Sequence, residues 1–211
     1  MLTPWEERMP YLEKIEKTMI KERIPQEIIK KLKIEHPVNN DPKNVIAVIE
    51  RMDKLLSDEQ RFAVMEKQGC CKSGQRDRDC KAFGIEHKNK PLAEKIKLLS
   101  GIQYMMIPRL NKDNTITVSY GGNQNGIHTG KTTCSCGQIK ELKQPFSVTP
   151  TFCGCCAGHF LYHYQNALGI KLKLKEIVSS PLNTNGEKPC EFKFEIVDSK
   201  NQRSKKSVNK K

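Results

Sequence analysis

This sequence has no long hydrophobic run. No stretch approaches the ~18 consecutive apolar residues that cross a bilayer, and the opening residues, MLTPWEERMP, lack the apolar segment of a signal peptide. The chain of 211 residues is long enough to bury a core, and its apolar residues, 36% of the total, are spread over almost the whole length. We therefore expect a folded cytoplasmic protein and neither a secreted nor a membrane protein.

Aromatic residues are scarce, at 6%, and they do not gather with basic residues as the stacking surface of a nucleic-acid-binding protein requires. The formal net charge is +13, but six positive charges lie in residues 199–211, where Val208 is the single apolar residue. We expect this segment to be a disordered basic tail. Its contacts with nucleic acid would be non-specific and salt-sensitive, so nucleic acid is not the expected main partner.

No internal repeat is present, and the hydrophobic period changes halfway along the chain. Residues 1–101 carry apolar side chains at helical spacing, with start signals at Asp41-Pro42, Ser57 and Pro91. Alternating patterns then predict strands over 115–120, 170–178 and 190–196, with a long helix from about 149 to 168. The expected fold class is α+β: an N-terminal helical region (1–101), then a cysteine-rich α+β domain (102–198) in which one long helix packs on an antiparallel sheet.

The sequence also lacks an isolated C-x2-C metal-binding pair, although it has nine cysteines; the one such spacing, from Cys153 to Cys156, lies within a group of three. An odd number of cysteines in a reducing compartment argues against a disulfide framework and favours metal binding or thiol chemistry. The cysteines are clustered, as a metal ion requires. We predict a metal site from Cys134, Cys136, Cys153, Cys155 and Cys190, and a possible second metal or thiol site from Cys70, Cys71 and Cys80.

The long predicted helix carries the most informative of these clusters. Cys155, His159 and His163 have the spacing i, i+4, i+8 and form one stripe. The neighbouring stripe, which contains Cys156 and Phe160, is the expected core face, so Cys156 should be buried and Cys155 and His159 should lie at its border. That border suits metal ligands or a thiolate of lowered pKa. For His163 a surface position is the favoured interpretation.

Two strand residues have competing interpretations. Strict alternation from Ile170 places the Glu176 carboxylate on the apolar face, where it would need a partner or a metal, whereas a bulge would turn it outward. Cys190 shares its face with Phe192 and Phe194, where a free cysteine is an ordinary small apolar residue.

The C-terminal part of the chain resembles a known family. The stretch CGCCAGHFLYHYQNALGIKLKLKEIVSS followed by NGEKPCEFKFEI is similar to the ending of 4-vinyl-reductase-type small-molecule-binding domains and of thiazoline-carboxylate hydrolases. The resemblance covers about 45 residues and implies a small α+β domain around an apolar ligand pocket. In some sensor members of this family, cysteines at the helix start and near the final strand bind zinc, which implies a site here at Cys153 or Cys155 together with Cys190. The chain departs from this pattern at Ser179-Ser180, where those sensors have another cysteine, so Cys134 and Cys136 would have to replace it.

Three functions follow as hypotheses. The first is a zinc-bearing small-molecule-binding protein, with a small-molecule ligand as partner and homodimerisation possible. The second is a hydrolase of a small cyclic amide or thiazoline, in which Cys155 or a metal-bound water attacks, His159 transfers the proton and Glu176 assists. The third is an iron–sulfur or thiol redox protein. The sequence has no serine triad or metalloprotease helix, so the first hypothesis leads.

Overall fold

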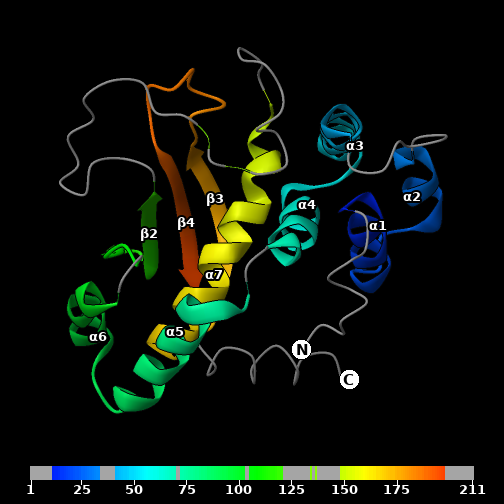
Figure 1. Cartoon of the computed structure of the whole chain (residues 1–211). Coiled ribbons are helices and arrows are strands. Elements are labelled where there is room, and N and C mark those ends of the chain that lie inside the picture. Colours follow the sequence, from blue (N-terminus) through cyan, green and yellow to red (C-terminus); the bar gives the residue numbers. More distant parts are fainter. Residues whose placement is uncertain are drawn as a thin grey trace.

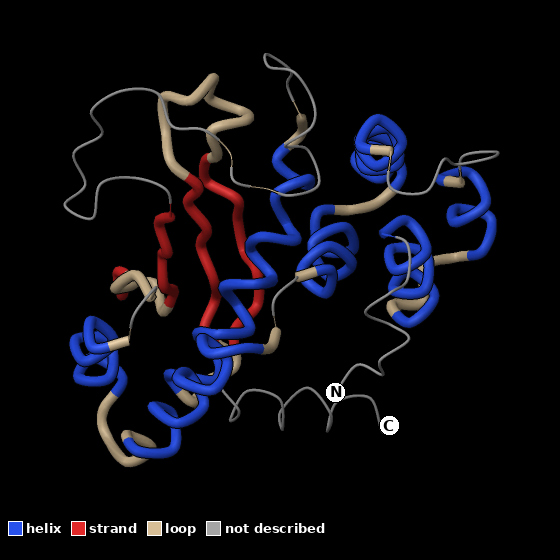
Figure 2. Tube along the Cα trace, viewed as in Figure 1, coloured by secondary structure: helices blue, strands red, loops and turns tan. Residues whose placement is uncertain are grey.

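The structure is a computed structural model that describes residues 11–33, 41–69, 72–102, 105–120, 134, 136 and 148–197. It has the expected α+β class, with helices first and then a four-stranded antiparallel sheet. A long helix, α7 (Gly154–Leu168), runs between the sheet on one side and the N-terminal helices on the other (Figure 1). Figure 2 shows the same division, with the strands gathered on the left of the view and the early helices on the right.

Four helices precede the central part of the fold, and local signals fix their starts. They are α1 (Tyr11–Lys21), α2 (Gln26–Leu32), α3 (Pro42–Leu55) and α4 (Asp58–Met65). Asp41 caps α3 by accepting a hydrogen bond from the amide of Lys43 at 2.9 Å. Ser57 and Gln60 form a capping box at the start of α4. A short 3-10 turn, η1 (Glu66–Gln68), then brings the chain against α7.

Two further helices, α5 (Gly74–Glu86) and α6 (Leu92–Leu98), pack on α7, and the turn η2 (Leu99–Gly101) follows them. Gly169 ends α7 in the left-handed conformation, with φ of 66°. The buried ammonium group of Lys95, on α6, donates to the carbonyl of Leu168 at 2.9 Å. A cation at this position satisfies a carbonyl that the end of the helix leaves without an intrahelical donor.

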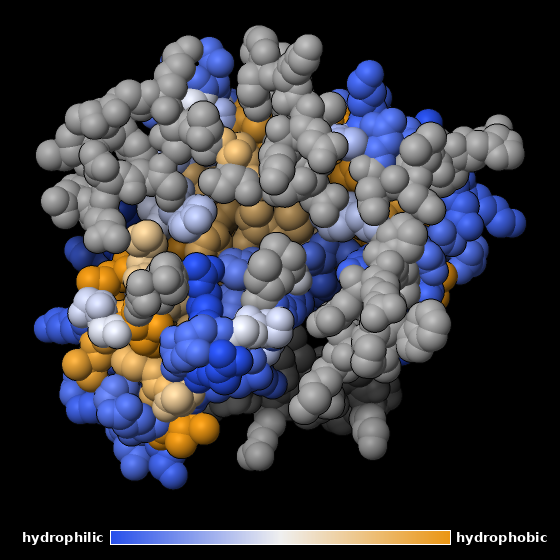
Figure 3. Space-filling model, in the orientation of Figure 1, coloured by the Kyte–Doolittle hydropathy of each residue, from blue (hydrophilic) through white to orange (hydrophobic). Residues whose placement is uncertain are grey.

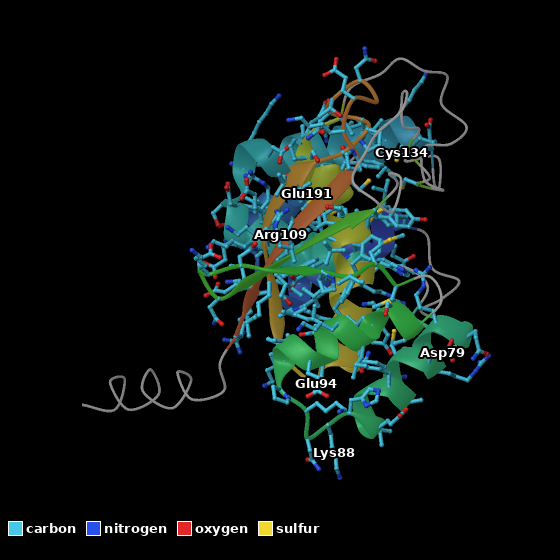
Figure 4. The ribbon with its side chains drawn as sticks, turned by 90° about the vertical axis from the view of Figure 1, so that its left-hand side faces the viewer. Asp79, Lys88, Glu94, Arg109, Cys134 and Glu191 are labelled. Carbon is cyan, nitrogen blue, oxygen red and sulfur yellow. The ribbon has the colours of Figure 1, made fainter. Side chains whose placement is uncertain are left out.

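The sheet has the strand order β1-β2-β4-β3, formed by β1 (Arg109–Leu110), β2 (Thr115–Tyr120), β4 (Cys190–Ile196) and β3 (Leu172–Ser179). Val118 lies opposite Phe192, and Leu174 lies opposite Phe194. These buried side chains form the face that packs on α7. The other face carries charged residues, among them Arg109 and Glu191, whose charged groups approach to 3.7 Å (Figure 4).

A register shift lies between Leu174 and Glu176. Before the shift Leu172 and Leu174 are buried, and after it Ile177 is buried while Glu176 and Val178 are exposed. A β-bulge reverses the inward and outward alternation of a strand in this way. Of the two interpretations of Glu176, the bulge that turns its side chain outward is therefore correct.

Glycines allow α7 to contact η1 at backbone distance. A Cβ atom on Gly158 would lie 1.8 Å from the carbonyl oxygen of Glu66, and one on Gly69 would lie 2.6 Å from the amide nitrogen of His159. No side chain fits between these segments. The buried hydrophobic residues of the described helices and strands, from Ile15 to Ile196, belong to one hydrophobic cluster.

The surface in Figure 3 is mainly hydrophilic on the described residues, with hydrophobic residues gathered at the lower left of the view, at the end formed by α5 and α6. Ile85 of α5 and Leu98 of α6 are among the exposed large apolar residues. Within the described part of the chain, no helix combines the length and the apolar character needed to cross a bilayer.

Candidate metal centre at the start of helix α7

Three thiols converge at the start of α7. The Sγ atoms of Cys136, Cys155 and Cys156 all lie within 4.8 Å of one another, so this group can hold a metal ion. Cys155 and Cys156 belong to the first turn of α7, which follows the 3-10 turn η3 (Pro150–Cys153), and Cys136 comes from a separate segment of the chain. Cys136 and Cys155 are among the ligands predicted from the sequence, whereas Cys156 is not.

The start of α7 is anchored to the N-terminal helices as well as to the sheet. The hydroxyl of Thr151, in η3, donates to the Asp53 carboxylate of α3 at 2.5 Å, and Arg61 of α4 lies 3.2 Å from the same carboxylate oxygen. Gly154 has no side chain, and a Cβ atom there would lie 2.6 Å from the Cβ of Met65. The thiols of Cys155 and Cys156 are thus carried by a fixed part of the backbone.

The environment of the Cys155 and Cys156 thiols favours their protonated forms. The contact with the Cys136 thiol raises the pKa of Cys155, and burial raises it further. The same contact with Cys136, together with the one to Cys155, raises the pKa of Cys156. Thiolate is the form that binds metal, so a cation bound here would displace protons from these sulfurs.

The raised pKa of Cys155 argues against its predicted role as a nucleophile. A thiolate of lowered pKa is one of the two roles predicted for Cys155, whereas the pKa of this thiol is raised. The Cys155 thiol also donates to the carbonyl of Phe152 at 3.7 Å. Its surroundings are those of a buried thiol, or of a thiolate neutralised by a cation, and differ from those of an activated, accessible nucleophile.

The other predicted ligands, Cys134, Cys153 and Cys190, lie outside the group of three thiols but close enough to influence one another. Burial raises the pKa of Cys153 to about 12, with a hydrogen bond from Ser180 opposing and the Cys134 and Cys136 thiols adding to the rise. Burial also raises the pKa of Cys190, and Cys153 and Cys134 contribute. Cys134 is half-buried, and its sulfur accepts a hydrogen bond from the amide of Cys136 at 3.4 Å. Figure 4 shows Cys134 at the end of the molecule opposite Lys88 and Glu94.

The histidines of α7 face α5 and contribute to a polar cluster. Nη1 of Arg76 lies 2.6 Å from Nε2 of His159. Because a guanidinium has only donors, His159 accepts through Nε2 and carries its proton on Nδ1. The His159 and His163 rings are in edge contact, with centroids 4.6 Å apart. His163 is 0% exposed, so the favoured prediction of a surface position for it is wrong.

Asp77 is the buried acid of this cluster. It accepts hydrogen bonds from the Tyr162 hydroxyl at 2.9 Å and from the Lys81 ammonium group at 2.8 Å. Burial alone would raise the pKa of Asp77, but these two hydrogen bonds, aided by the charge of Lys81 and by His163, hold it below its ordinary value. The cluster thus joins α5 to α7 through polar contacts that the sequence pattern did not predict.

The predicted second site is described only in part. Cys80 is completely buried on α5, and burial raises its pKa to about 11. Cys70 and Cys71 lie outside the described residues, as does the predicted tail 199–211.

Glu176, predicted as a catalytic assistant, lies at the bulge of β3 with its side chain exposed, opposite Lys193 in the sheet. Cys155 is buried, with 8% exposure, and His159 contacts Arg76 of α5 and the ring of His163. Glu176, exposed on the sheet, therefore does not share the buried environment of the Cys155 thiol.

Comparison of the whole chain with protein-family models, with curated protein sequences and with solved structures finds no match. The functional interpretation of this chain therefore depends on its own residues.

Proposed function

We propose that this protein is a zinc-bearing small-molecule-binding protein in which Cys136, Cys155 and Cys156 hold the ion. The observation that carries the proposal is the convergence of these three sulfurs within 4.8 Å. Three thiols meet at the start of α7, where the Cys136 thiol and burial disfavour the thiolate forms of Cys155 and Cys156, so this group is costly to ionise without a cation. A bound dication removes that cost.

Zinc is the expected ion because its structural sites are tetrahedral and rich in cysteine. We expect Cys134 to supply the fourth sulfur. It precedes Cys136 by two residues, and its sulfur already lies 3.4 Å from the Cys136 amide nitrogen. Cys153 is the weaker candidate because its thiol has a hydrogen bond with Ser180.

Small-molecule binding is supported by the resemblance of residues 153–196 to ligand-binding domains. It is tested separately, by measuring the thermal stability of the zinc-loaded protein against a panel of small apolar carboxylic acids and amides. A ligand that binds the folded state raises the melting temperature in a concentration-dependent way.

The metal proposal is tested by elemental analysis of untagged protein purified without oxygen. We expect about one zinc per chain in the wild type, a large loss in Cys156→Ser and Cys155→Ser, and a content unchanged from the wild type in Cys80→Ser. Cys80 is the matched control because it is equally a buried cysteine but lies on α5. Equal zinc in all four proteins, or no metal in any, would reject the site.

The same preparation tests the iron–sulfur hypothesis. Six described cysteines at or near the start of α7 offer enough sulfur for a cluster. Iron with a broad absorption band near ~400 nm would replace zinc in the proposal.

A further inference from the structure

Tyr11, the first residue of α1, extends the thiol group. Its hydroxyl forms a hydrogen bond with the Cys155 thiol. The sulfurs of Cys136 and Cys156 are also close enough to Tyr11 to influence it electrostatically. The residue comes from the opposite end of the chain, and its ring packs against the hydrophobic core. Tyrosine is not a usual ligand of a structural zinc site, and the sequence alone predicts no role for Tyr11.

Helix α1 is held in a fixed position relative to α7. Its buried residues Ile15 and Met19 pack in the core. The Gln68 side chain, in η1, donates to the Thr18 hydroxyl at 2.9 Å, and Lys67 pairs with Glu22. The η1 backbone in turn touches Gly158 of α7. The contact between Tyr11 and Cys155 is thus supported by the packing of both helices.

We propose that Tyr11 is a positioning residue of this metal centre, whose hydroxyl donates a hydrogen bond to the Cys155 thiolate when an ion is bound. This inference rests on the metal site proposed above. A dication held by three or four thiolates leaves a net negative charge in a buried place, and a neutral O–H donor stabilises that charge without adding to it. Coordination by a tyrosinate would instead add another negative charge.

The hydrogen bond also links metal occupancy to α1. In the loaded site the acceptor is a thiolate, and a hydrogen bond to an ionised acceptor is roughly twice as strong as one between neutral groups. The start of α1 should therefore be held more firmly in the loaded protein than in the metal-free protein.

The test uses cobalt(II) alone as the probe, because its thiolate charge-transfer band reports on the sulfur ligands. Metal-free full-length protein is titrated without oxygen, as wild type, Tyr11→Phe and Tyr164→Phe. Tyr164→Phe is the matched control, since it removes a hydroxyl that donates to a backbone carbonyl, that of Met106, and does not contact the three thiols.

We expect all three proteins to bind the same amount of cobalt. Tyr11→Phe should bind it about 10–100-fold more weakly, the usual effect of losing a partner of a metal ligand. Its charge-transfer band should move to lower energy because the Cys155 thiolate loses a hydrogen bond. A wild-type affinity and spectrum in Tyr11→Phe would overturn the role of Tyr11 and leave the metal site intact. Absence of cobalt binding in the wild type would overturn the site itself.

A second measurement does not depend on a variant. Hydrogen exchange of the wild type is compared with and without cobalt. We expect slower exchange on loading in the first turn of α1 as well as at the start of α7. Slower exchange at α7 with no change in α1 would contradict the inference.

Discussion

At the residue scale, the sequence located the thiol site but misassigned its faces. The helix stripe predicted Cys156 as core and Cys155 as border, yet Cys155 is buried and Cys156 half-buried. The stripe argument assumes that one side of a helix meets solvent. Helix α7 is covered by the sheet on one side and by α4, η1 and α5 on the other, so it has no such side. Gly154 and Gly158 were the sequence signal that other elements pack closely against this side of the helix.

Glu66 supports a prediction about pH. Its carboxylate accepts a hydrogen bond from the Leu174 amide at 3.3 Å, and burial raises the pKa of Glu66 despite that bond and the nearby lysines. The folded state therefore binds this proton more tightly than the unfolded state does, and stability is lost as pH rises through the folded-state pKa. Glu66→Gln keeps an acceptor for Leu174 without the charge.

We expect Glu66→Gln to be more stable than the wild type at pH 7.5, with the difference shrinking toward pH 4. Urea unfolding at both pH values measures this, with exposed Glu86→Gln as the control. A Glu66→Gln variant that is less stable at pH 7.5 would show that the carboxylate is favourable in its ionised form.

At the element scale, α7 is the central helix of the packing. It has a backbone contact with η1 and a polar cluster with α5. The sequence predicted its end at residue 168 because capping and periodicity are local signals, but the helix begins at Gly154, after the 3-10 turn η3, and not near residue 149 as predicted. It did not predict the backbone contact with η1 or the polar cluster with α5, because these depend on which elements meet. The bulge in β3 likewise could not be decided from the sequence alone, because a one-residue shift in strand pairing does not change the amino-acid composition of the strand.

Gly158→Ala tests the backbone contact. The added methyl group would lie 1.8 Å from the Glu66 carbonyl oxygen, which belongs to backbone and cannot rotate away. We expect a loss of about 1–3 kcal/mol or more in the free energy of unfolding. Gly101→Ala meets no atom within 4 Å and should change stability little. Equal stability of the two variants would mean that α7 and η1 are farther apart than described.

Lys95→Met tests the end of α7. The substitution keeps an apolar chain of similar length but removes the hydrogen bond to the Leu168 carbonyl. We expect a loss of about 1.5–3 kcal/mol, as for hydrogen bonds to charged groups. Lys97→Met, at an exposed position on the same helix, is the control. If both variants unfold at the same urea concentration as the wild type, the Lys95 contact does not stabilise the fold.

At the scale of the whole molecule, the predicted class is confirmed and the position of the site follows from it. Long-range pairing brings β4, the start of α7 and the segment with Cys134 and Cys136 to one end of the fold, where α1 contributes Tyr11. Spacing along the chain predicted that the cysteines of residues 134–156 would meet. It gave no reason to include a tyrosine near residue 10, because that contact depends on how the N-terminal helices pack against α7.

The most direct test of the metal centre is X-ray absorption at the zinc edge of protein purified without oxygen and without added metal. We expect an ion surrounded by sulfur at about 2.3 Å, the zinc–thiolate distance, and a sulfur shell that shrinks in Cys156→Ser and stays the same in Cys80→Ser. A zinc ion surrounded by nitrogen and oxygen at about 2.0–2.2 Å, or one whose shell is identical in both variants, would contradict a site built from Cys136, Cys155 and Cys156.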